Sequence, residues 1–146
     1  MDKLPNLVKQ WLAGEIPPPP VVQLVGMRLL EAQEGAARVA LQTGQQHYNP
    51  MGTVHGGILC DLADAAMGVA MASTILNGET FTTSELSIHY FRPVQVALLT
   101  ATAKVIHRGR STGYIECEIH DEGGRLIAKS ASTCKVQSNR LNPEVP

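Results

Sequence analysis

Hydrophobic and polar residues follow different patterns in successive parts of this 146-residue chain. Apolar side chains recur at helical spacing in residues 2–15, which predicts a short amphipathic helix. Four consecutive prolines at residues 17–20 must end that helix, and they favour an extended polyproline connector. Residues 21–35 and 36–44 then read as two strands joined by a Glu-Gly turn.

A stretch dominated by Ala, Met, Leu, Val and Gly follows at residues 58–76. Apolar residues on nearly every side predict a helix that is buried all round, and its start is expected near His55 or Gly56. Two aspartates interrupt the apolar run, and what remains is too short to cross a bilayer. The helix is expected to close at the Asn-Gly pair that follows it.

After this helix the sequence becomes rich in Thr, Val, Ile, Tyr and Phe, which predicts four consecutive antiparallel strands. They are expected at residues 80–94, 97–109, 112–124 and 125–137. Their short turns allow hairpins and exclude the helical crossovers of a parallel sheet. The predicted fold is therefore α+β, a curved antiparallel sheet around one long helix. One domain is expected over residues 21–140, with a helix and connector at 1–20 and a tail at 141–146.

Size, charge and cysteine content narrow the classes of function. A chain of this length suits one domain that buries roughly 70% of its unfolded surface. A net charge of -1 without a run of basic residues argues against a nucleic-acid partner. No signal peptide or membrane span is recognised, so a cytoplasmic protein is expected. Three cysteines without CxxC spacing predict buried thiols, and argue against a disulfide framework or a zinc knuckle.

Candidate chemistry begins at the predicted start of the long helix, where His55 precedes Gly56 and Gly57. The first amides of a helix lack internal partners and carry the positive end of the dipole. Glycine there lets a ligand approach the backbone, so the terminus can hold a phosphate, a carboxylate or a developing oxyanion. The same glycines also fit a simple tight turn between strand and helix.

Asp64 lies nine residues after His55, which corresponds to roughly 13 Å along one helix. It therefore cannot serve a carbonyl held at the N-terminus of its own helix. Two antiparallel copies of the helix across a two-fold axis could bring the two groups together, which requires at least a dimer. The alternative is a buried acid satisfied by hydrogen bonds, although buried carboxylates tend to mark function. Asp61 is expected to stabilise the dipole or to face polar surroundings.

Other common chemistries lack their motifs. The remaining histidines show no HxxxH or HExxH spacing, so no metal site is expected. The sequence contains no GxSxG elbow, GxGxxG motif or P-loop, which argues against the usual serine hydrolases and nucleotide-binding folds. Cys60 lies in the predicted helix with nothing basic placed to lower its pKa, so an inert thiol is expected.

The segment NPMGTVHGGILCDLAD resembles the signature of the hot-dog fold acyl-CoA thioesterases, in particular the phenylacetate-degradation type of the 4-hydroxybenzoyl-CoA thioesterase superfamily. Asn49 stands six residues before His55, and Asp64 nine residues after it, as in the family pattern. TTSELSIHYFRPV is similar to the family's next strand, where a Ser or Thr faces the acid. Thr83 matches that position, or Thr82 if the register slips by one. The resemblance covers nearly all of the chain after the prolines.

The resemblance implies hydrolysis of a CoA thioester. The Gly56 amide would polarise the thioester carbonyl, and Asp64 of the neighbouring subunit would act as general base or nucleophile. Asn49 would orient the thioester or the water, His55 would order the loop and contact the acyl carbonyl or sulfur region, and Thr83 would hold the water or the carboxylate. His55 as sole general base is the lesser alternative. No cofactor is expected, because coenzyme A is part of the substrate.

Binding of the CoA moiety is expected from a second set of residues. These are Gly57, Thr82, Arg108, Arg110 and Ser111. Guanidinium groups suit phosphate oxygens, but the two arginines could also simply solvate an exposed hairpin. Arg92 is expected to be a structural or subunit-contact residue. The expected partners are the acyl-CoA substrate and a second copy of the chain, with pairing of two dimers into a homotetramer.

Two other functions are compatible with the same fold. One is a hot-dog hydratase or dehydratase acting on enoyl or 3-hydroxyacyl thioesters, which would also use a histidine and an acid. The other is a non-catalytic acyl-CoA sensor, which would not need Asp64. The spacing of Asn49, His55 and Asp64 favours the hydrolase over both.

Overall fold

The structure is a computed structural model that describes residues 5–138, and in this range it has three α-helices, one 3-10 helix and six strands. They are α1 (Asn6–Leu12), α2 (Pro20–Val25), β1 (Met27–Gln33), β2 (Ala36–Gln42), η1 (Gln45–His47), α3 (Gly56–Ala72), β3 (Glu79–Tyr90), β4 (Leu98–Arg108), β5 (Thr112–His120) and β6 (Leu126–Ser138). The start of the helix predicted at 2–15 and the tail predicted at 141–146 lie outside the described residues.

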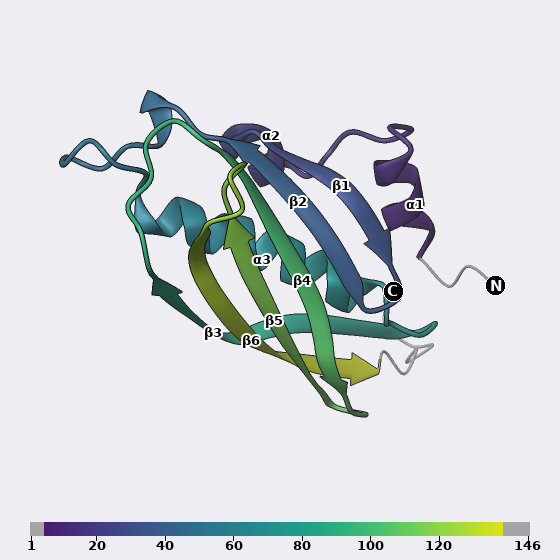
Figure 1. Ribbon diagram of the computed structural model, residues 1–146. Coiled ribbons are helices and arrows are strands. Elements are labelled where there is room, and N and C mark those ends of the chain that lie inside the picture. Colours follow the sequence, from purple (N-terminus) through teal and green to yellow (C-terminus); the bar gives the residue numbers. More distant parts are fainter. Residues whose placement is uncertain (1–4, 139–146) are drawn as a thin grey trace.

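The six strands form one antiparallel sheet in the order β1-β2-β4-β5-β6-β3. Helix α3 packs against β2, β4 and β5, so the sheet curves around it (Figure 1). This confirms the predicted α+β hot-dog architecture. The four late strands and their antiparallel pairing are also confirmed, and the first of them, β3, pairs with the last, β6. Residues 91–97 are longer than a tight hairpin loop, and they let the chain pass from the edge of the sheet to its middle.

The strand predicted over residues 21–35 is wrong in its first part. Pro20 opens α2 at a position where its missing N–H costs nothing, and Gly26 ends the helix with φ of 93°. The Gly26 amide donates to the carbonyl of Val22 at 2.9 Å, which closes the last turn. Proline at the start and glycine after the end were the signals for this short helix. The polyproline connector therefore covers only the first three of the four prolines.

Helix α3 ends at Ala72, before the Asn-Gly pair expected to close it. The Ser73 hydroxyl donates to the carbonyl of Ala70 at 2.6 Å, and it accepts the amide of Gly35 at 2.7 Å. A serine that binds the backbone in this way competes with further helix formation. Gly78, with φ of 81°, instead makes the turn that leads into β3.

One side of α3 supplies the centre of the core. Its buried residues are Leu59, Leu62, Ala63, Ala66, Met67, Val69, Ala70 and Met71. The other side is not buried within one chain, because Gly57, Asp61 and Asp64 are exposed there. These three residues follow helical spacing and form one stripe, which we call the open face of α3. The prediction of a helix buried on all sides is therefore wrong for the single chain.

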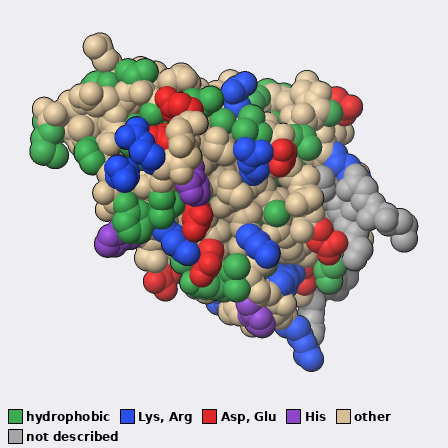
Figure 2. Space-filling model, viewed as in Figure 1, with side chains coloured by type: hydrophobic (Ala, Val, Ile, Leu, Met, Phe, Trp, Pro, Cys, Tyr) green, Lys and Arg blue, Asp and Glu red, His purple; other side chains and the backbone are tan. Residues whose placement is uncertain are grey.

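Charges of both signs are interspersed on the face of the molecule seen in Figure 2. One exposed pair places Lys129 Nζ 3.8 Å from Glu118 Oε1 on neighbouring strands. Such solvated pairs contribute little to stability. Among the helices of residues 5–138, none is both long and apolar enough to cross a membrane.

Candidate functional site

His55 is the N-cap residue of α3. Its backbone is extended, with φ of -61° and ψ of 135°, and its Nδ1 accepts the amide of Gly57 at 2.9 Å. The His55 amide donates to the carbonyl of His47 at 2.8 Å, which ties the helix start to η1. Within residues 5–138 the Gly56 amide has no acceptor. One free donor therefore remains at the positive end of a 17-residue helix, as expected from the His-Gly-Gly sequence.

Asn49 shapes the loop that leads to this helix. Its Oδ1 accepts the amides of Met51 at 3.0 Å and Thr53 at 3.2 Å, and its Nδ2 donates to Thr53 Oγ1 at 3.0 Å. An asparagine that bonds its own backbone two and four residues on holds a turn in one conformation. Asn49 thus lies in the loop before the helix start, and its carboxamide is hydrogen-bonded within that loop.

Asp64 lies on the open face of α3, and Thr83 of β3 faces it. Thr83 Oγ1 donates to Asp64 Oδ1 at 3.4 Å, a long hydrogen bond. No cationic side chain within residues 5–138 forms an ion pair with Asp64. Thr82 is exposed, and alternation along the strand directs it to the opposite face of the sheet. Of the two candidate threonines, only Thr83 therefore contacts the acid.

The acid and the free amide are separated within one chain. Gly56 and Asp64 are eight residues apart on α3, which is about 12 Å along the helix axis. Asp61 lies between them on the same face. Partial desolvation of its carboxyl group on the helix, and then the negative charge of Asp64, raise the pKa of Asp61. One α3 therefore presents two neighbouring carboxylates on its open face and a hydrogen-bond donor at its end.

The cysteines differ from one another in burial. Cys117 and Cys134 are buried, as expected, and burial raises the pKa of the Cys117 thiol to about 12. Burial also raises the pKa of the Cys134 thiol. Cys60 is only half-buried, so the prediction of a buried thiol is wrong there. Raised pKa values leave the two buried thiols protonated, which does not suit a nucleophile.

Tyr90 is a contact of the helix start that the sequence did not indicate. Its hydroxyl donates to the carbonyl oxygen of Gly56 at 2.7 Å and lies 3.3 Å from Cys60 Sγ. Tyr90 ends β3, 34 residues after Gly56. An aromatic residue at a strand end has no local signature that could reveal so distant a partner.

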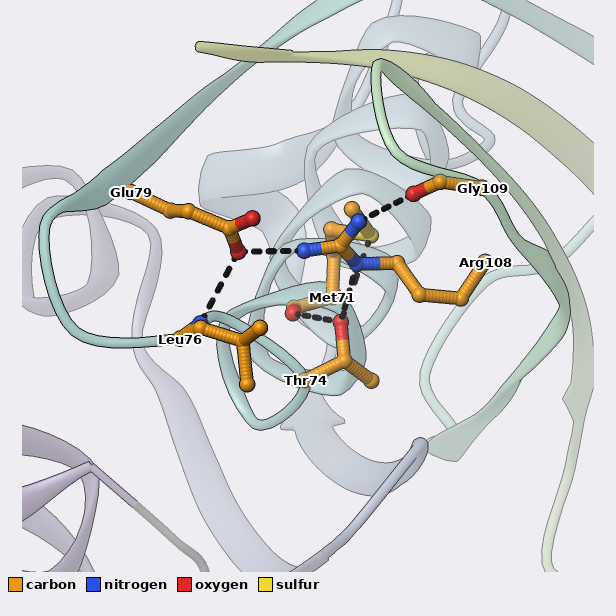
Figure 3. A network of polar contacts seen from close by, with 6 residues as sticks. All are labelled: Met71, Thr74, Leu76, Glu79, Arg108 and Gly109. Carbon is orange, nitrogen blue, oxygen red and sulfur yellow. Dashed lines mark hydrogen bonds and ion pairs between the residues drawn. The ribbon is translucent and has the colours of Figure 1, made fainter. Parts of the chain in front are cut away.

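Arg108 is committed to a network at the C-terminal end of α3 (Figure 3). Its Nη2 lies 2.5 Å from Glu79 Oε2, its Nε donates to Thr74 Oγ1 at 3.2 Å, and its Nη1 donates to the carbonyl of Gly109. Glu79 Oε2 also accepts the amide of Leu76 at 2.9 Å. The Arg108 and Glu79 side chains are only 20% and 14% exposed. This guanidinium therefore joins the end of α3 to β3 and β4.

Removing Glu79 should destabilise the fold, because the partly buried Arg108 guanidinium then has no counter-ion. We expect Glu79→Ala to lower the free energy of unfolding by about 2 kcal/mol. Urea denaturation at one fixed protein concentration measures this. Glu31→Ala is the matched control, since Glu31 pairs with Arg38 at 3.0 Å on the surface, and we expect it to cost less than about 1 kcal/mol. Equal losses in both variants would contradict a structural role for the Arg108 network.

Arg110 and Ser111 lie at the tip of the hairpin between β4 and β5. Both are exposed, and the Gly109 amide closes the turn by donating to the carbonyl of Thr112 at 2.8 Å. Arg110 makes no ion pair within residues 5–138. Because Arg108 beside this hairpin contacts Thr74, the tip lies near the C-terminal end of α3. Gly56 is at the other end of that helix, about 24 Å away along its axis.

The predicted site residues thus form three groups in one chain. The first is the helix start with Asn49, and the second is the Asp64–Thr83 pair in the middle of α3. The third is the hairpin with Arg110 at the far end. Comparison with known proteins identifies the family to which the chain belongs. A sequence model of the "Thioesterase superfamily" matches residues 51–128, which include the helix start, Asp64, Thr83 and the hairpin.

The chain belongs to the thioesterase superfamily.

Similar proteins agree with this assignment. The chain is 31% identical over 118 residues to a 1,4-dihydroxy-2-naphthoyl-CoA hydrolase of Listeria monocytogenes, covering 81% of this chain and 96% of the relative. It is 33% identical over 105 residues to the acyl-coenzyme A thioesterase PaaI of Escherichia coli, covering 71% and 73%. The solved structure of the E. coli PaaI protein superposes with a TM-score of 0.79 and 28% identity, covering 88% of this chain and 91% of that one. The predicted hot-dog thioesterase of the PaaI type is confirmed.

Proposed function

We propose that this thioesterase hydrolyses an acyl-CoA to the free acid and CoA at a site shared by two subunits. The observation that carries the proposal is the contact between Thr83 and Asp64 on the open face of α3, where the carboxylate has no cationic partner among residues 5–138. A carboxylate held in this way can act as base or nucleophile. The names of the relatives that act on CoA thioesters support the choice of substrate.

In this proposal the thioester carbonyl accepts a hydrogen bond from the Gly56 amide, which the α3 dipole strengthens. Asp64 of the partner subunit then removes a proton from water as the water attacks, or its carboxylate attacks the carbonyl carbon itself. The tetrahedral oxyanion collapses, the C–S bond breaks, and the CoA thiolate leaves and takes up a proton. With water as the nucleophile this step gives the free acid, whereas attack by Asp64 gives an acyl-Asp64 anhydride that water then hydrolyses to the free acid and the regenerated carboxylate. Thr83 orients the acid, Asn49 orders the loop, and His55 holds the Gly57 amide.

The open face and one sheet edge support a dimer. β3 is an edge strand of twelve residues, and within the described part of the chain its one partner is β6. An open edge of this length is a template for pairing with another strand. Two copies related by a two-fold axis would set their α3 helices antiparallel, which brings the Gly56 of one chain toward the Asp64 of the other. Pairing of two such dimers into a tetramer stays a prediction.

In the same antiparallel arrangement, the CoA moiety would bind at the hairpin between β4 and β5. The hairpin of one chain lies at the far end of its own α3, so it approaches the Gly56 of the other chain. Arg110 and Ser111 are exposed there and can bind phosphate oxygens. Thr82 and Gly57 are exposed as well and remain candidate contacts. Arg108 retains two unused N–H groups, but its ion pair with Glu79 opposes a direct role.

Release of free thiol from a panel of aryl, short, medium and long acyl-CoAs tests the function directly. We expect turnover on at least one class, and the panel then ranks the acyl groups. Hydration of enoyl-CoA without thiol release would replace the proposal by a hydratase. Binding of acyl-CoA without any chemistry would replace it by a sensor.

A further inference from the structure

The peptide group between Gly56 and Gly57 is held from both sides. Its carbonyl oxygen accepts the Tyr90 hydroxyl at 2.7 Å, and its N–H donates to His55 Nδ1 at 2.9 Å. The adjacent amide, that of Gly56 itself, is the one left without an acceptor within residues 5–138. The Gly56 amide belongs to the preceding peptide group, and its direction relative to the held peptide depends on the φ and ψ of Gly56. The His55 carbonyl of that preceding peptide accepts the amide of Ile58 at 2.9 Å. Tyr90 and His55 restrain the peptide on the other side of the Gly56 α-carbon, and so limit how far the free amide can turn.

Tyr90 also explains why a glycine occupies position 56. A Cβ atom added there would lie 2.9 Å from the Tyr90 oxygen and 3.0 Å from its Cζ. The phenol thus packs directly on the Gly56 α-carbon. The two residues form a matched pair, in which the missing side chain of one accommodates the ring of the other.

We propose that Tyr90 is a positioning residue for thioester hydrolysis, which with His55 clamps the Gly56–Gly57 peptide and so directs the Gly56 amide at the substrate carbonyl. This inference rests on the proposed function. Tyr90 acts through Gly56, and its own hydroxyl is occupied by the backbone. Burial, and then the hydrogen bond with Cys60, raise the pKa of Tyr90 to about 12, so the phenol keeps the proton that it donates.

A preorganised donor loses much of its effect when it is slightly misaligned, because the transition state requires an accurate geometry. Tyr90→Phe removes the hydroxyl and keeps the ring. We expect kcat on the best acyl-CoA to fall about tenfold, which corresponds to the loss of one hydrogen bond, with KM unchanged. Steady-state thiol release measures both constants. Tyr114→Phe, at an exposed position of β5, is the control expected to stay close to wild type.

A double variant at Tyr90 and Gly56 tests whether Tyr90 acts through Gly56 or has a merely structural role. Gly56→Ala should displace the Tyr90 ring and break the same hydrogen bond. The double variant with Tyr90→Phe should therefore be no slower than the slower single variant. Independent effects would multiply and overturn the inference. An unchanged kcat in Tyr90→Phe, or a raised KM with unchanged kcat, would overturn it as well.

The outcome for Asp64→Asn shows which proposal has failed. If that variant is inactive and Tyr90→Phe is as fast as wild type, the hydrolase stands and the clamp is wrong. If the wild-type protein releases no thiol from any acyl-CoA, the proposed function is wrong, and Tyr90 and His55 then have no role in thioester hydrolysis. In either case, amide NMR signals of Gly56 and Gly57 in Tyr90→Phe report whether the hydroxyl orders the peptide.

Discussion

Replacing Gly56 by proline should reduce kcat by about three orders of magnitude, because proline removes the one amide that the helix start offers to a carbonyl oxygen. The backbone tolerates this change. Gly56 is the first residue of α3, where proline is favoured, and His55 before it is extended with ψ of 135°. The helix should therefore form normally, and circular dichroism together with the Tm checks that it does.

Gly56→Ala is the matched control, since it adds a Cβ at the same place and keeps the N–H. It should cost only about the tenfold expected from displacement of Tyr90. The ratio of the two variants then isolates the amide from the steric change. If proline and alanine are equally slow, the Gly56 amide does not stabilise the oxyanion.

Much of this site could be predicted from local sequence. His55, Gly56 and Gly57 gave the helix start, because a cap and small residues mark a helix N-terminus within a few positions. The β-strands after α3 were also predictable, since β-branched and aromatic residues repeat between clear turn signals. The sequence already favoured Thr83 over Thr82, and in the structure it is Thr83 that donates to Asp64.

Most of the features that the sequence did not reveal depend on contacts between distant parts of the chain. Pairing of β3 with β6 is decided by which strands reach the middle of the sheet, and no turn motif reports it. The ion pair of Arg108 was hidden from sequence reasoning because its partner Glu79 lies 29 residues earlier. Tyr90 escaped notice for the same reason. The exposed side of α3 did have a local signal, because Asp61 and Asp64 interrupt the apolar run and share one helical stripe with Gly57.

Asp64→Asn should lower kcat by about a thousandfold or more while KM changes little, because the amide keeps the size of the acid and cannot act as base or nucleophile. Thr83 can still donate to the remaining carbonyl oxygen of the asparagine side chain. Asp61→Asn is the control, because Asp61 lies one turn away on the same open face. A similar loss in both variants would mean that the charge of the face matters and not a particular acid.

The two inactive variants can also show whether the site spans two subunits. In a dimer of one Asp64→Asn chain and one Gly56→Pro chain, an antiparallel pairing of α3 leaves one site with both groups intact. Such heterodimers, purified through two different tags, should regain about half of the wild-type activity. Each homodimer should stay inactive. If the amide and the acid worked within one chain, every site of the heterodimer would lack one of them, and no activity would return.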